Sequence, residues 1–479
     1  MWDDVFVRPQ PWLVVVFVAA AIGLVFAGLS TYDFVQHLDR QVHDLHCSFI
    51  PGLGKQPGES GCQVAMMSAY SSVFRTQVWG GVPIALPAMA VFAFIAFYAV
   101  DLMIARRNRD PRATAFLALA TTLPAVVSIV MLVISLSQLG TTCKLCVGIY
   151  LASGLGLVGA IVVWRRAVAG SATDKPIATR RAPARDVAGD PAWASARDVD
   201  RAAPKLVELD TIPASNGFLV GAFAIGVAFV ALPVALYFGL APDHGRFIGT
   251  CGSLAKPDDV YAAGKGTNGV LLRIGPTHGG ANAANAIEIL DPLCPACRAF
   301  EQRLVGSGFA DQLDRRAVLF PLDDTCNWMV TEATHPGACT VSEAVLCATE
   351  TSGGAQPVLE WAFAHQEGIR TETKADPGAA ARLVKQRFPD LASCVGSAEV
   401  KARLNKSLRW AVANNIRVLT PQLFVDNVKL CDEDVDLGLE YTLNVMLERH
   451  ANRTLAATPL EASPPTKPAA PAHGSGGAR

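Results

Sequence analysis

One stretch organises the rest of the chain: Thr141-Thr142-Cys143-Lys144-Leu145-Cys146-Val147-Gly148-Ile149-Tyr150. Its two cysteines lie three residues apart at the head of an apolar run that continues to Trp164. Because about 20 apolar residues span a bilayer, the sequence predicts a dithiol where a membrane helix meets water on one side. A redox pair there can react with both a lipid-soluble molecule and a soluble one. The alternative is that both thiols are buried and only pack, as free cysteines often do.

The composition is that of a multidomain membrane protein. The 479 residues are 51% hydrophobic with a mean hydropathy of +0.30, and the length suits about three domains. The net charge of −1, with no Lys/Arg-rich patch interleaved with aromatics, argues against nucleic-acid binding. The twelve cysteines favour disulfide chemistry in an oxidising compartment over zinc, because no second Cys-x-x-Cys is paired with histidines at finger-like spacing.

Five uncharged runs predict transmembrane helices. The runs are Pro9–Tyr32, about Val82–Val100, about Ala113–Gly140, Cys143 to Arg165-Arg166, and Thr211–Pro242. The connection 106–112 is strongly basic and is therefore cytoplasmic by the positive-inside rule. Alternation then puts the loop with Cys47 and Cys62 on the same outer face as the start of the fourth helix. The acidic segment 1–4 argues against a cleaved signal peptide.

The predicted domains follow from these runs. Residues 1–168 form a four-helix membrane domain, and residues 169–210, rich in Ala, Pro, Arg and Asp, form a flexible cytoplasmic linker. Residues 211–242 cross outward again, so that the globular sequence 249–450 lies on the outer side. The tail 451–479 is rich in Pro, Ala, Gly and Ser and is predicted to be disordered.

A second Cys-x-x-Cys, Cys294-Pro-Ala-Cys297, follows a predicted strand at 286–291 and opens a predicted helix. Pro295 fits the first helical position, where its missing N–H is not needed. Cys294 is expected to be the attacking sulfur, because a helix N-terminus stabilises a thiolate and lowers its pKa. A structural disulfide or half of a metal site is the alternative.

The outer domain continues in the order typical of one fold. After the helix come a predicted strand at 316–322, a mostly helical stretch at 326–413, a strand at 418–425 containing Thr420-Pro421, and a partner strand at 428–430. In this order, residues 265–447 resemble thioredoxin-fold disulfide oxidoreductases of the bacterial periplasm, the kind with a helical insertion. The resemblance implies that Thr420 and Pro421 form a cis-proline loop that presents backbone to a substrate peptide.

The loop cysteines matter because thiol–disulfide exchange needs a relay partner within reach. The motif residues of the membrane domain are Cys47, Cys62, Ser68, Cys143, Cys146 and Tyr150. Through them it resembles the vitamin K epoxide reductase family, which combines a four-helix bundle, two loop cysteines, a Cys-x-x-Cys opening the last helix and a quinone between the helices. Ser68 corresponds to the family's serine in the segment leading to the second helix. Two departures concern the pocket cap: fourteen residues separate the loop cysteines, and 74–83 is longer than the usual Phe-Gly-x-Pro.

The resemblance implies a role for each of these cysteines. Cys146 is expected to reduce the quinone, and Cys143 to exchange with Cys62. Cys47 is expected to accept electrons from outside. Tyr150 is expected to donate a hydrogen bond to a quinone carbonyl; its alternative is an interfacial aromatic anchor.

The remaining cysteines are expected to be structural. The favoured pairs, which spacing alone cannot establish, are Cys326 with Cys339 and Cys347 with Cys394, leaving Cys251 and Cys431 to pair or stay free. His43 and His46 invite a zinc interpretation, which we set aside because solvated loop histidines are far commoner and a metal would block Cys47.

The predicted fold is therefore a multi-domain one: an all-α membrane bundle of four core helices plus a fifth, then an α/β thioredoxin-fold domain with a helical insertion. By resemblance, electrons pass from substrate thiols through the Cys294 pair, the Cys47 pair and the Cys143 pair to a quinone, either ubiquinone or menaquinone. The expected setting is a bacterial inner membrane, with the thioredoxin-fold domain on the periplasmic side. The expected partners are the quinone pool, the lipid bilayer and secreted or periplasmic cysteine-containing proteins; no metal is expected.

The direction of electron flow depends on relative potentials. A proline after the first cysteine and the lack of a feature for cytosolic electron import favour oxidation of the substrates. The first alternative is a disulfide isomerase or reductant running in the opposite direction. The second, from another class, is a membrane-anchored, non-catalytic peptide-binding or chaperone module whose cysteines are all structural.

Overall fold

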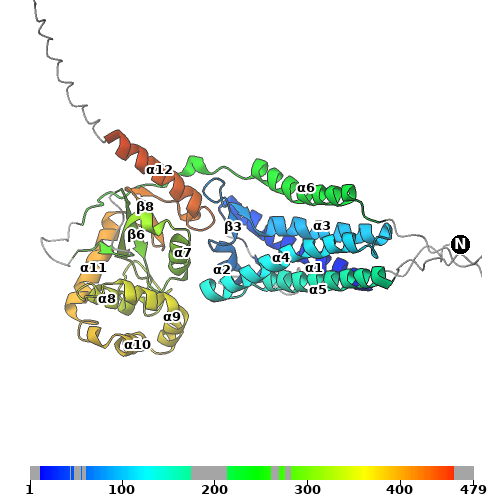
Figure 1. Cartoon of the computed structure of the whole chain (residues 1–479). Helices are drawn as coiled ribbons and strands as arrows, with labels where there is room; N and C mark the ends of the chain where they lie inside the picture. Colours follow the sequence, from blue (N-terminus) through cyan, green and yellow to red (C-terminus); the bar gives the residue numbers. More distant parts are fainter. Residues whose placement is uncertain are drawn as a thin grey trace, which may run out of the picture.

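The computed structural model describes residues 11–41, 43, 45–47, 55–56, 61–173, 213–259, 269–275 and 282–457. A bundle of long apolar helices and a mixed α/β domain follow one another along a common axis (Figure 1). Most of the predicted linker 169–210, and the predicted tail beyond residue 457, lie outside the described residues.

Within the described residues, five helices are long and apolar enough to cross a membrane, which confirms the predicted number. They are α1 (Pro11–Gln36), α3 (Ala85–Ile104), α4 (Pro111–Ile134), α5 (Lys144–Thr173) and α6 (Asn216–Leu240). A π-helical turn, η2 (Ser135–Leu139), extends α4. α1 packs against α3 and α5, α4 packs on α5, and α6 lies along α3 at the outside of the bundle (Figure 1).

The basic connection between α3 and α4 is also where α6 begins. Asp110 caps α4 by accepting hydrogen bonds from the backbone N–H of Arg112 at 2.7 Å and of Ala113 at 3.1 Å. Pro111 at the first helical position suits this start. Asp110 also accepts from the backbone N–H of Ala214, which ties the start of α6 to this turn.

Two helix ends differ from the sequence prediction. The expected end of the fourth helix at 165–166 is wrong, because α5 continues to Thr173; arginine is a good helix former and does not stop a helix whose side chains can reach solvent. The first helix continues to Gln36 and includes the buried Asp33, whose charge is paired with His46.

Short elements between α1 and α3 form a cap on the bundle. They are η1 (His37–Asp39), β1 (Leu45–His46), β2 (Lys55–Gln56), α2 (Gly61–Met67), β3 (Ser72–Val73) and β4 (Val82–Pro83). β1 pairs with β2 and β3 with β4, both antiparallel. Cys62, expected in a loop, is the second residue of α2. α3 starts at Ala85 rather than Val82 because the chain first forms β4.

The outer domain is built on a five-stranded sheet of order β5-β7-β6-β8-β9. The strands are β5 (Leu272–Arg273), β6 (Ala284–Leu290), β7 (Leu313–Leu319), β8 (Gln422–Val425) and β9 (Val428–Lys429). β6 is parallel to β7 and antiparallel to β8, with Glu288 opposite Ala317 on one side and Leu423 on the other. This topology, with a helix crossing from β6 to β7, is the thioredoxin fold, as predicted.

Helices cover both faces of the sheet. They are α7 (Pro295–Gly306), α8 (Ala338–Ala348), α9 (Gln356–Ala375), α10 (Ala379–Arg387), α11 (Ala398–Ala413) and α12 (Leu439–Ala457). Single 3-10 turns lie at η4 (Gly245–Phe247), η5 (Ala310–Gln312), η6 (Pro389–Leu391) and η7 (Asp432–Asp434). α7 and α12 pack on one face through Phe300 and Leu443, and α11 packs on the other through Leu408 and Trp410. The helical insertion 326–413 is confirmed; α12 was not predicted, and β8 begins at Gln422 rather than at residue 418.

Candidate functional site

The membrane dithiol lies at the start of α5. Cys143 takes the capping position: its carbonyl oxygen accepts a hydrogen bond from the backbone N–H of Val147 at 3.0 Å, and its Sγ accepts one from that of Cys146 at 3.3 Å. Both cysteines are free thiols, and Cys143 is buried. Unpaired N–H groups and the helix dipole stabilise negative charge at this position. The first cysteine is therefore placed to react as a thiolate.

A disulfide lies beside this dithiol. Cys47 and Cys62 are bonded to each other, and both belong with Cys143 to one buried apolar cluster. Gly61 permits the close approach of α2 to the start of α5, because a Cβ at residue 61 would overlap the backbone oxygen of Thr142. The disulfide and the dithiol thus share one water-poor site.

A cavity of about 320 Å³ opens next to these sulfur atoms. Cys62, Cys143 and Cys146 line it, together with Ser68 and Tyr150. The rest of its wall comes mainly from apolar side chains of α1, α3, α4 and α5. Tyr150 lies one turn beyond Cys146 on α5. Five of the six membrane-domain residues singled out in the sequence therefore line one cavity, and the sixth, Cys47, is bonded to Cys62.

A buried carboxylate that the sequence did not single out completes the wall. Asp33 is 3% exposed and lines the cavity. Its Oδ1 lies 2.6 Å from Nδ1 of His46, and its Oδ2 accepts from the backbone N–H of His46 at 2.9 Å, so it holds the residue that precedes Cys47. His43 pairs instead with Asp39 at 2.9 Å. The two histidines weighed as zinc ligands therefore bind different carboxylates.

The second dithiol lies at the start of α7. Cys294 caps this helix and Pro295 takes its first position. A hydrogen bond from the thiol of Cys297 lowers the pKa of Cys294 from an ordinary 9.0 to about 7, against the opposing effect of burial. Burial raises the pKa of Cys297, which is 0% exposed. The pair is thus divided into a thiolate-forming sulfur at the helix end and a protonated one behind it.

The loop before β8 faces this sulfur. The peptide bond between Thr420 and Pro421 is cis, and Sγ of Cys294 donates to the carbonyl oxygen of Thr420 at 3.5 Å. The backbone of this loop is therefore in direct contact with the sulfur that the sequence marked as the attacking one.

Three side chains behind Cys294 were missed in the sequence. Asp291 accepts from the backbone N–H of Leu293 at 2.7 Å, and its other oxygen lies 2.7 Å from Nδ1 of His335. Burial disfavours a charged imidazole, but the hydrogen bond and charge of Asp291 outweigh it and raise the pKa of His335. Gln366 donates to the carbonyl oxygen of Cys294 at 2.8 Å. Only Asp291, directly after a strand, carried a positional signal; the other two come from the helical insertion.

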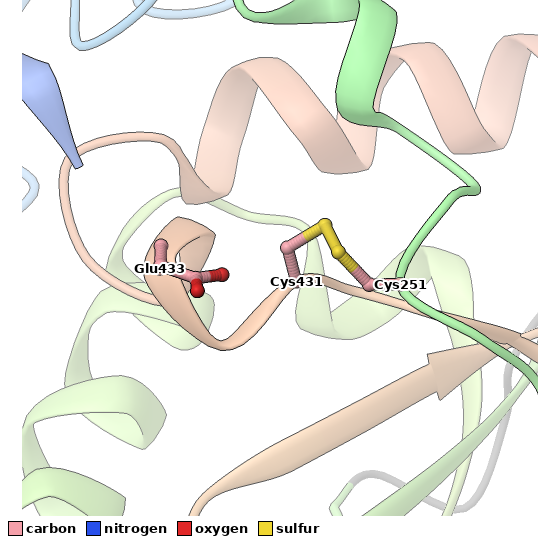
Figure 2. Close-up of side chains that lie close together, drawn as sticks. All are labelled: Cys251, Cys431 and Glu433. Carbon is pink, nitrogen blue, oxygen red and sulfur yellow. A yellow bond between two sulfur atoms is a disulfide. The ribbon is translucent and has the colours of Figure 1, made fainter.

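The six remaining cysteines form three disulfides. Both favoured pairings in the insertion, Cys326 with Cys339 and Cys347 with Cys394, are confirmed, and Cys251 pairs with Cys431. In the described part of the chain, one group brings three possible metal ligands together, namely this last pair and Glu433 (Figure 2). Its two sulfur atoms are bonded to each other and are not available as thiolate ligands. The expected absence of a metal stays a prediction.

The two dithiols belong to separate sites. Among the described residues, no hydrogen bond or disulfide joins Cys294 or Cys297 to a cysteine of the bundle. α7 meets the cap through its C-terminal end, where Arg303 donates to the carbonyl oxygen of Met67. Cys294 lies nine residues earlier, about 13 Å along the helix.

The membrane dithiol and the loop disulfide lie in a segment that is similar to a known family. Residues 14–161 match the model of the vitamin K epoxide reductase family. No curated protein matches the chain. Among solved structures, NmDsbA1 from Neisseria meningitidis is 17% identical with a TM-score of 0.27, covering 41% of this chain and 99% of its own.

Two further structures are similar to part of the chain. α-DsbA1 from Wolbachia pipientis is 13% identical with a TM-score of 0.29, covering 42% of this chain and 96% of its own. ScsC from Proteus mirabilis is 15% identical with a TM-score of 0.28, covering 49% of this chain and 100% of its own.

The chain is therefore a membrane protein with a vitamin K epoxide reductase family domain at residues 14–161 and a thioredoxin-fold domain after it. Thiol–disulfide exchange needs a disulfide within reach of a reactive thiol. The membrane dithiol lies beside a disulfide, and the second dithiol contains a helix-capping thiol of lowered pKa. The protein is a thiol–disulfide oxidoreductase.

Proposed function

We propose that this protein forms disulfide bonds in other proteins and passes the electrons to a membrane quinone. The observation that carries the proposal is the cavity whose wall contains Cys62, Cys143 and Cys146, because one apolar site then holds a disulfide, a dithiol and room for a lipid-soluble acceptor. A thioredoxin-fold dithiol on the same chain supplies the entry point for substrate thiols. Tethering keeps donor and acceptor at high effective concentration.

Each handover balances as an exchange of two electrons and two protons. A substrate thiolate attacks the Cys294–Cys297 disulfide, forms a mixed disulfide, and a second substrate thiol releases it, leaving both cysteines reduced. The thiolate of Cys294 then attacks Cys47, Cys62 leaves as a thiol, and Cys297 resolves the mixed disulfide. Electrons continue in the same way from the loop pair to the pair at the head of α5.

The last pair is proposed to reduce the quinone. The wall fits such a molecule, being mainly apolar with hydroxyl groups on Ser68 and Tyr150. We assign Tyr150 to a quinone carbonyl and Ser68 to the polar edge of the site.

The exchange between the two membrane-domain pairs is reversible, and during substrate oxidation it runs from the loop pair to the α5 pair. The thiolate of Cys62 attacks the Cys143–Cys146 disulfide at Cys143, and Cys146 leaves. Cys47 then resolves the mixed disulfide, so that the loop pair is again a disulfide and the α5 pair is a dithiol. Oxidation of that dithiol, with Cys146 reacting first, turns one quinone into one quinol.

Substrate entry requires the thioredoxin-fold domain to move. Cys294 is 4% exposed and Cys47 is 3% exposed, so neither sulfur is open to a partner in the observed arrangement. The cap touches the far end of α7 rather than the end that carries Cys294. We propose that the domain turns on its connection to α6 to bring Cys294 to Cys47, and that the backbone at Thr420 and Pro421 holds the substrate peptide.

The distribution of basic residues and the disulfides support a proposal for the cellular setting. The basic connection 106–112 and the arginines at 165–166 lie at one end of the bundle, and the cysteine pairs lie at the other (Figure 1). By the positive-inside rule the basic end is cytoplasmic, which puts the thioredoxin-fold domain in the periplasm of a bacterial inner membrane. The four disulfides among the described residues suit that oxidising compartment.

The direction of flow is supported by the lowered pKa of Cys294. A stabilised thiolate favours the reduced form of the pair, so its disulfide is a better oxidant of substrates. A reductant or isomerase running in the opposite direction would draw its electrons from a quinol, and the stabilised thiolate of Cys294 disfavours that direction. We therefore assign oxidation.

The test is quinone reduction by the full chain in lipid nanodiscs, with a reduced, cysteine-containing client protein as the electron donor. We expect one quinol for each client disulfide formed. Cys146→Ser should abolish both quinol formation and client oxidation. Cys294→Ser should abolish both when the client protein is the electron donor, but quinone reduction by dithiothreitol should remain. Client oxidation that proceeds without quinol, or unchanged in Cys146→Ser, would refute the proposed function.

A further inference from the structure

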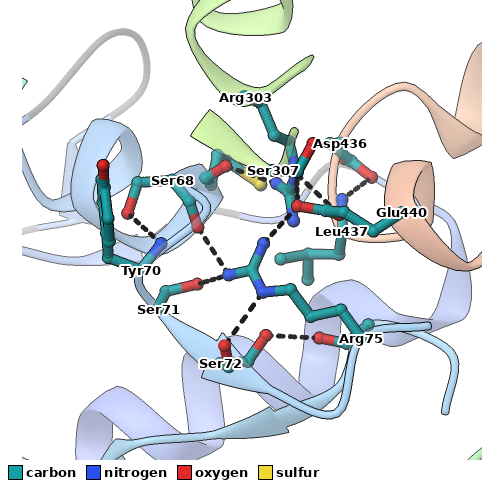
Figure 3. Close-up of polar contacts among 12 residues, drawn as sticks. Ser68, Tyr70, Ser71, Ser72, Arg75, Arg303, Ser307, Asp436, Leu437 and Glu440 are labelled. Atoms are coloured by element: carbon teal, nitrogen blue, oxygen red, sulfur yellow. Dashed lines mark hydrogen bonds and ion pairs between the residues drawn. The ribbon is translucent and has the colours of Figure 1, made fainter. Parts of the chain in front are cut away.

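Three charged side chains are buried together where the thioredoxin-fold domain meets the cap (Figure 3). The carboxylate of Glu440, at the start of α12, lies 2.5 Å from Nη1 of Arg75 in the cap and 3.0 Å from Nε of Arg303 on α7. The exposed fractions of the three side chains are 2% for Glu440, 8% for Arg75 and 2% for Arg303. One carboxylate thus joins two guanidinium groups from different parts of the chain.

This cluster depends on all three members. Burial and the neighbouring charge of Arg303 lower the pKa of Arg75 to about 10, while Glu440 opposes that shift. Removing the carboxylate would leave two like charges together in a site with little water, which is strongly unfavourable. Undocking the domain has a different effect, because Arg303 and Glu440 leave together and the cap loses both contacts of Arg75 and Met67 with the domain.

Both arginines also hold one end of α2. Arg303 donates to the carbonyl oxygen of Met67, the last residue of that helix, and Arg75 donates to the carbonyl oxygen of Ser68 at 2.6 Å. Carbonyl groups at a helix C-terminus have no partner within the helix and need one from outside. With seven residues, α2 is too short to be stable alone. The cluster therefore supplies an external anchor to a helix that needs one.

The anchored helix is part of the cavity wall. Cys62, Ala65 and Met66 of α2 line the cavity, and so does Ser68 directly after it. At its other end, Gly61 packs on the backbone before Cys143. A shift of α2 would therefore change the shape of the cavity and the position of Cys62 together.

Resting on the proposed function, we propose that Arg75 and Arg303 are positioning residues that couple docking of the thioredoxin-fold domain to the quinone site. With the domain docked, the cluster holds the end of α2 and the cavity wall is complete. With the domain turned away for exchange with Cys47, Arg303 and Glu440 leave together, the anchor on Met67 is lost and the affinity for quinone falls. Docking and quinone binding then strengthen each other, since such coupling is reciprocal.

Apolar contacts also hold the docked domain on the cap and place Glu440 next to it. Leu437 is buried against Phe34 and Leu38 of the bundle. Trp79 lies so close to Gly438 that a Cβ there would overlap its ring. These contacts hold the segment before α12, and Met66 and Met67 of α2 pack on the same cluster. The apolar contacts can therefore keep the domain docked when the charge cluster is changed, but they do not bind the terminal carbonyl groups of α2.

The chain offers a matched control. Arg40, after η1, donates through Nε to Asp434 of η7 at 2.9 Å. This ion pair joins the same two parts of the protein, and the side chain of Asp434 is 0% exposed. It makes no contact with α2 among the hydrogen bonds of the described residues. Arg40→Ala therefore removes an ion pair between the same two parts while the apolar contacts of Leu437 and Trp79 keep the domain docked and the anchor stays in place.

The test measures KM and kcat for a soluble quinone with dithiothreitol as the reductant. The quinone is decylubiquinone or menadione, according to which of them the unaltered full chain reduces. Dithiothreitol reduces the bundle cysteines directly, so defects at Cys294 do not affect the measured rate of quinone reduction. We expect Arg303→Ala to raise the quinone KM about tenfold with kcat changed by no more than about twofold. Arg303→Lys, which keeps a donor for Met67, should recover part of the loss, and Arg40→Ala should leave KM unchanged.

Hydrogen exchange on the full chain gives a readout that does not depend on turnover. In Arg303→Ala we expect faster exchange at 61–68, with unchanged protection in β6 and α5. An unchanged KM in Arg303→Ala, or an equal rise in Arg40→Ala, would overturn the inference and leave the proposed function standing. An unaltered chain that reduces no quinone would overturn both. Loss of protection from hydrogen exchange throughout the chain would show that Arg303 is needed only for folding, and this result would also overturn the inference.

Discussion

The ionisation of Cys294 gives the sharpest quantitative prediction. With a pKa of about 7, half of this thiol is ionised at pH 7, whereas a thiol with the ordinary value of 9.0 is about 1% ionised. The largest cause is the hydrogen bond from Cys297. Cys297→Ala removes that donor, and a rise of only about one pKa unit lowers the thiolate fraction at pH 7 roughly fivefold. Cys297→Ser keeps an O–H donor and should retain most of the ionisation.

The assay is alkylation of the reduced full chain by brief pulses of iodoacetamide between pH 5.5 and 9, with mass spectrometry of the peptide that contains Cys294. Because the thiolate is the reacting form, the rate follows ionisation. We expect a midpoint near pH 7 in the unaltered chain and in Cys297→Ser, and a clearly higher one in Cys297→Ala. A midpoint near 9 in the unaltered chain, or the same midpoint in both variants, would refute the reasoning.

Two further predictions concern the bundle and the insertion. Gly61→Ala should push α2 away from the backbone of Thr142 and slow electron transfer from the loop pair to the α5 pair, measured as quinol formation in a single turnover; an unchanged rate would show that the close approach is not needed. Replacing Cys347 and Cys394 together by alanine removes a disulfide that closes a separation of 47 residues, which should lower the free energy of unfolding of the thioredoxin-fold domain by about 4 kcal/mol. Urea denaturation followed by tryptophan fluorescence measures this, and a loss below about 1 kcal/mol would contradict the expected role.

Much of the site was predictable because its reactive cysteines form short local sequence motifs. A Cys-x-x-Cys at the head of an apolar run can hardly be placed anywhere but at the end of a membrane helix, and Cys143 does cap α5. The same holds for Cys294, where a preceding strand and Pro295 mark the helix start. The cis peptide before Pro421 was also anticipated, from the order of the elements around it.

The parts that were not predictable depend on contacts between distant segments. His335 reaches Asp291 across 44 residues of sequence, and Arg75 reaches Glu440 across 365. No local pattern marks such partners, because any surface arginine or histidine has the same sequence context. Asp33 was placed in a loop for the same reason: its charge ended the apolar run, and the pairing with His46 that lets α1 continue is visible only in three dimensions.

The arrangement also separates two demands on the cap. In the proposed relay, the loop pair must be reachable from outside for exchange with Cys294, and it must be dry and well placed for exchange with Cys143. A single rigid cap would serve only one of these demands. The proposed domain, which both delivers electrons and anchors α2, would serve them in turn, because docking and delivery would use opposite ends of α7.

The relay itself is tested most directly by trapping its first internal step. In Cys297→Ala, Cys294 has no resolving partner, so its attack on the loop disulfide should leave a Cys294–Cys47 bond that acid quenching preserves. Mass spectrometry without reduction should find this bond, and Cys47→Ala in the same background should remove it. If Cys294 formed mixed disulfides with client proteins but never with a cysteine of the bundle, the two dithiols would be separate in chemistry and the account of a single relay would be contradicted.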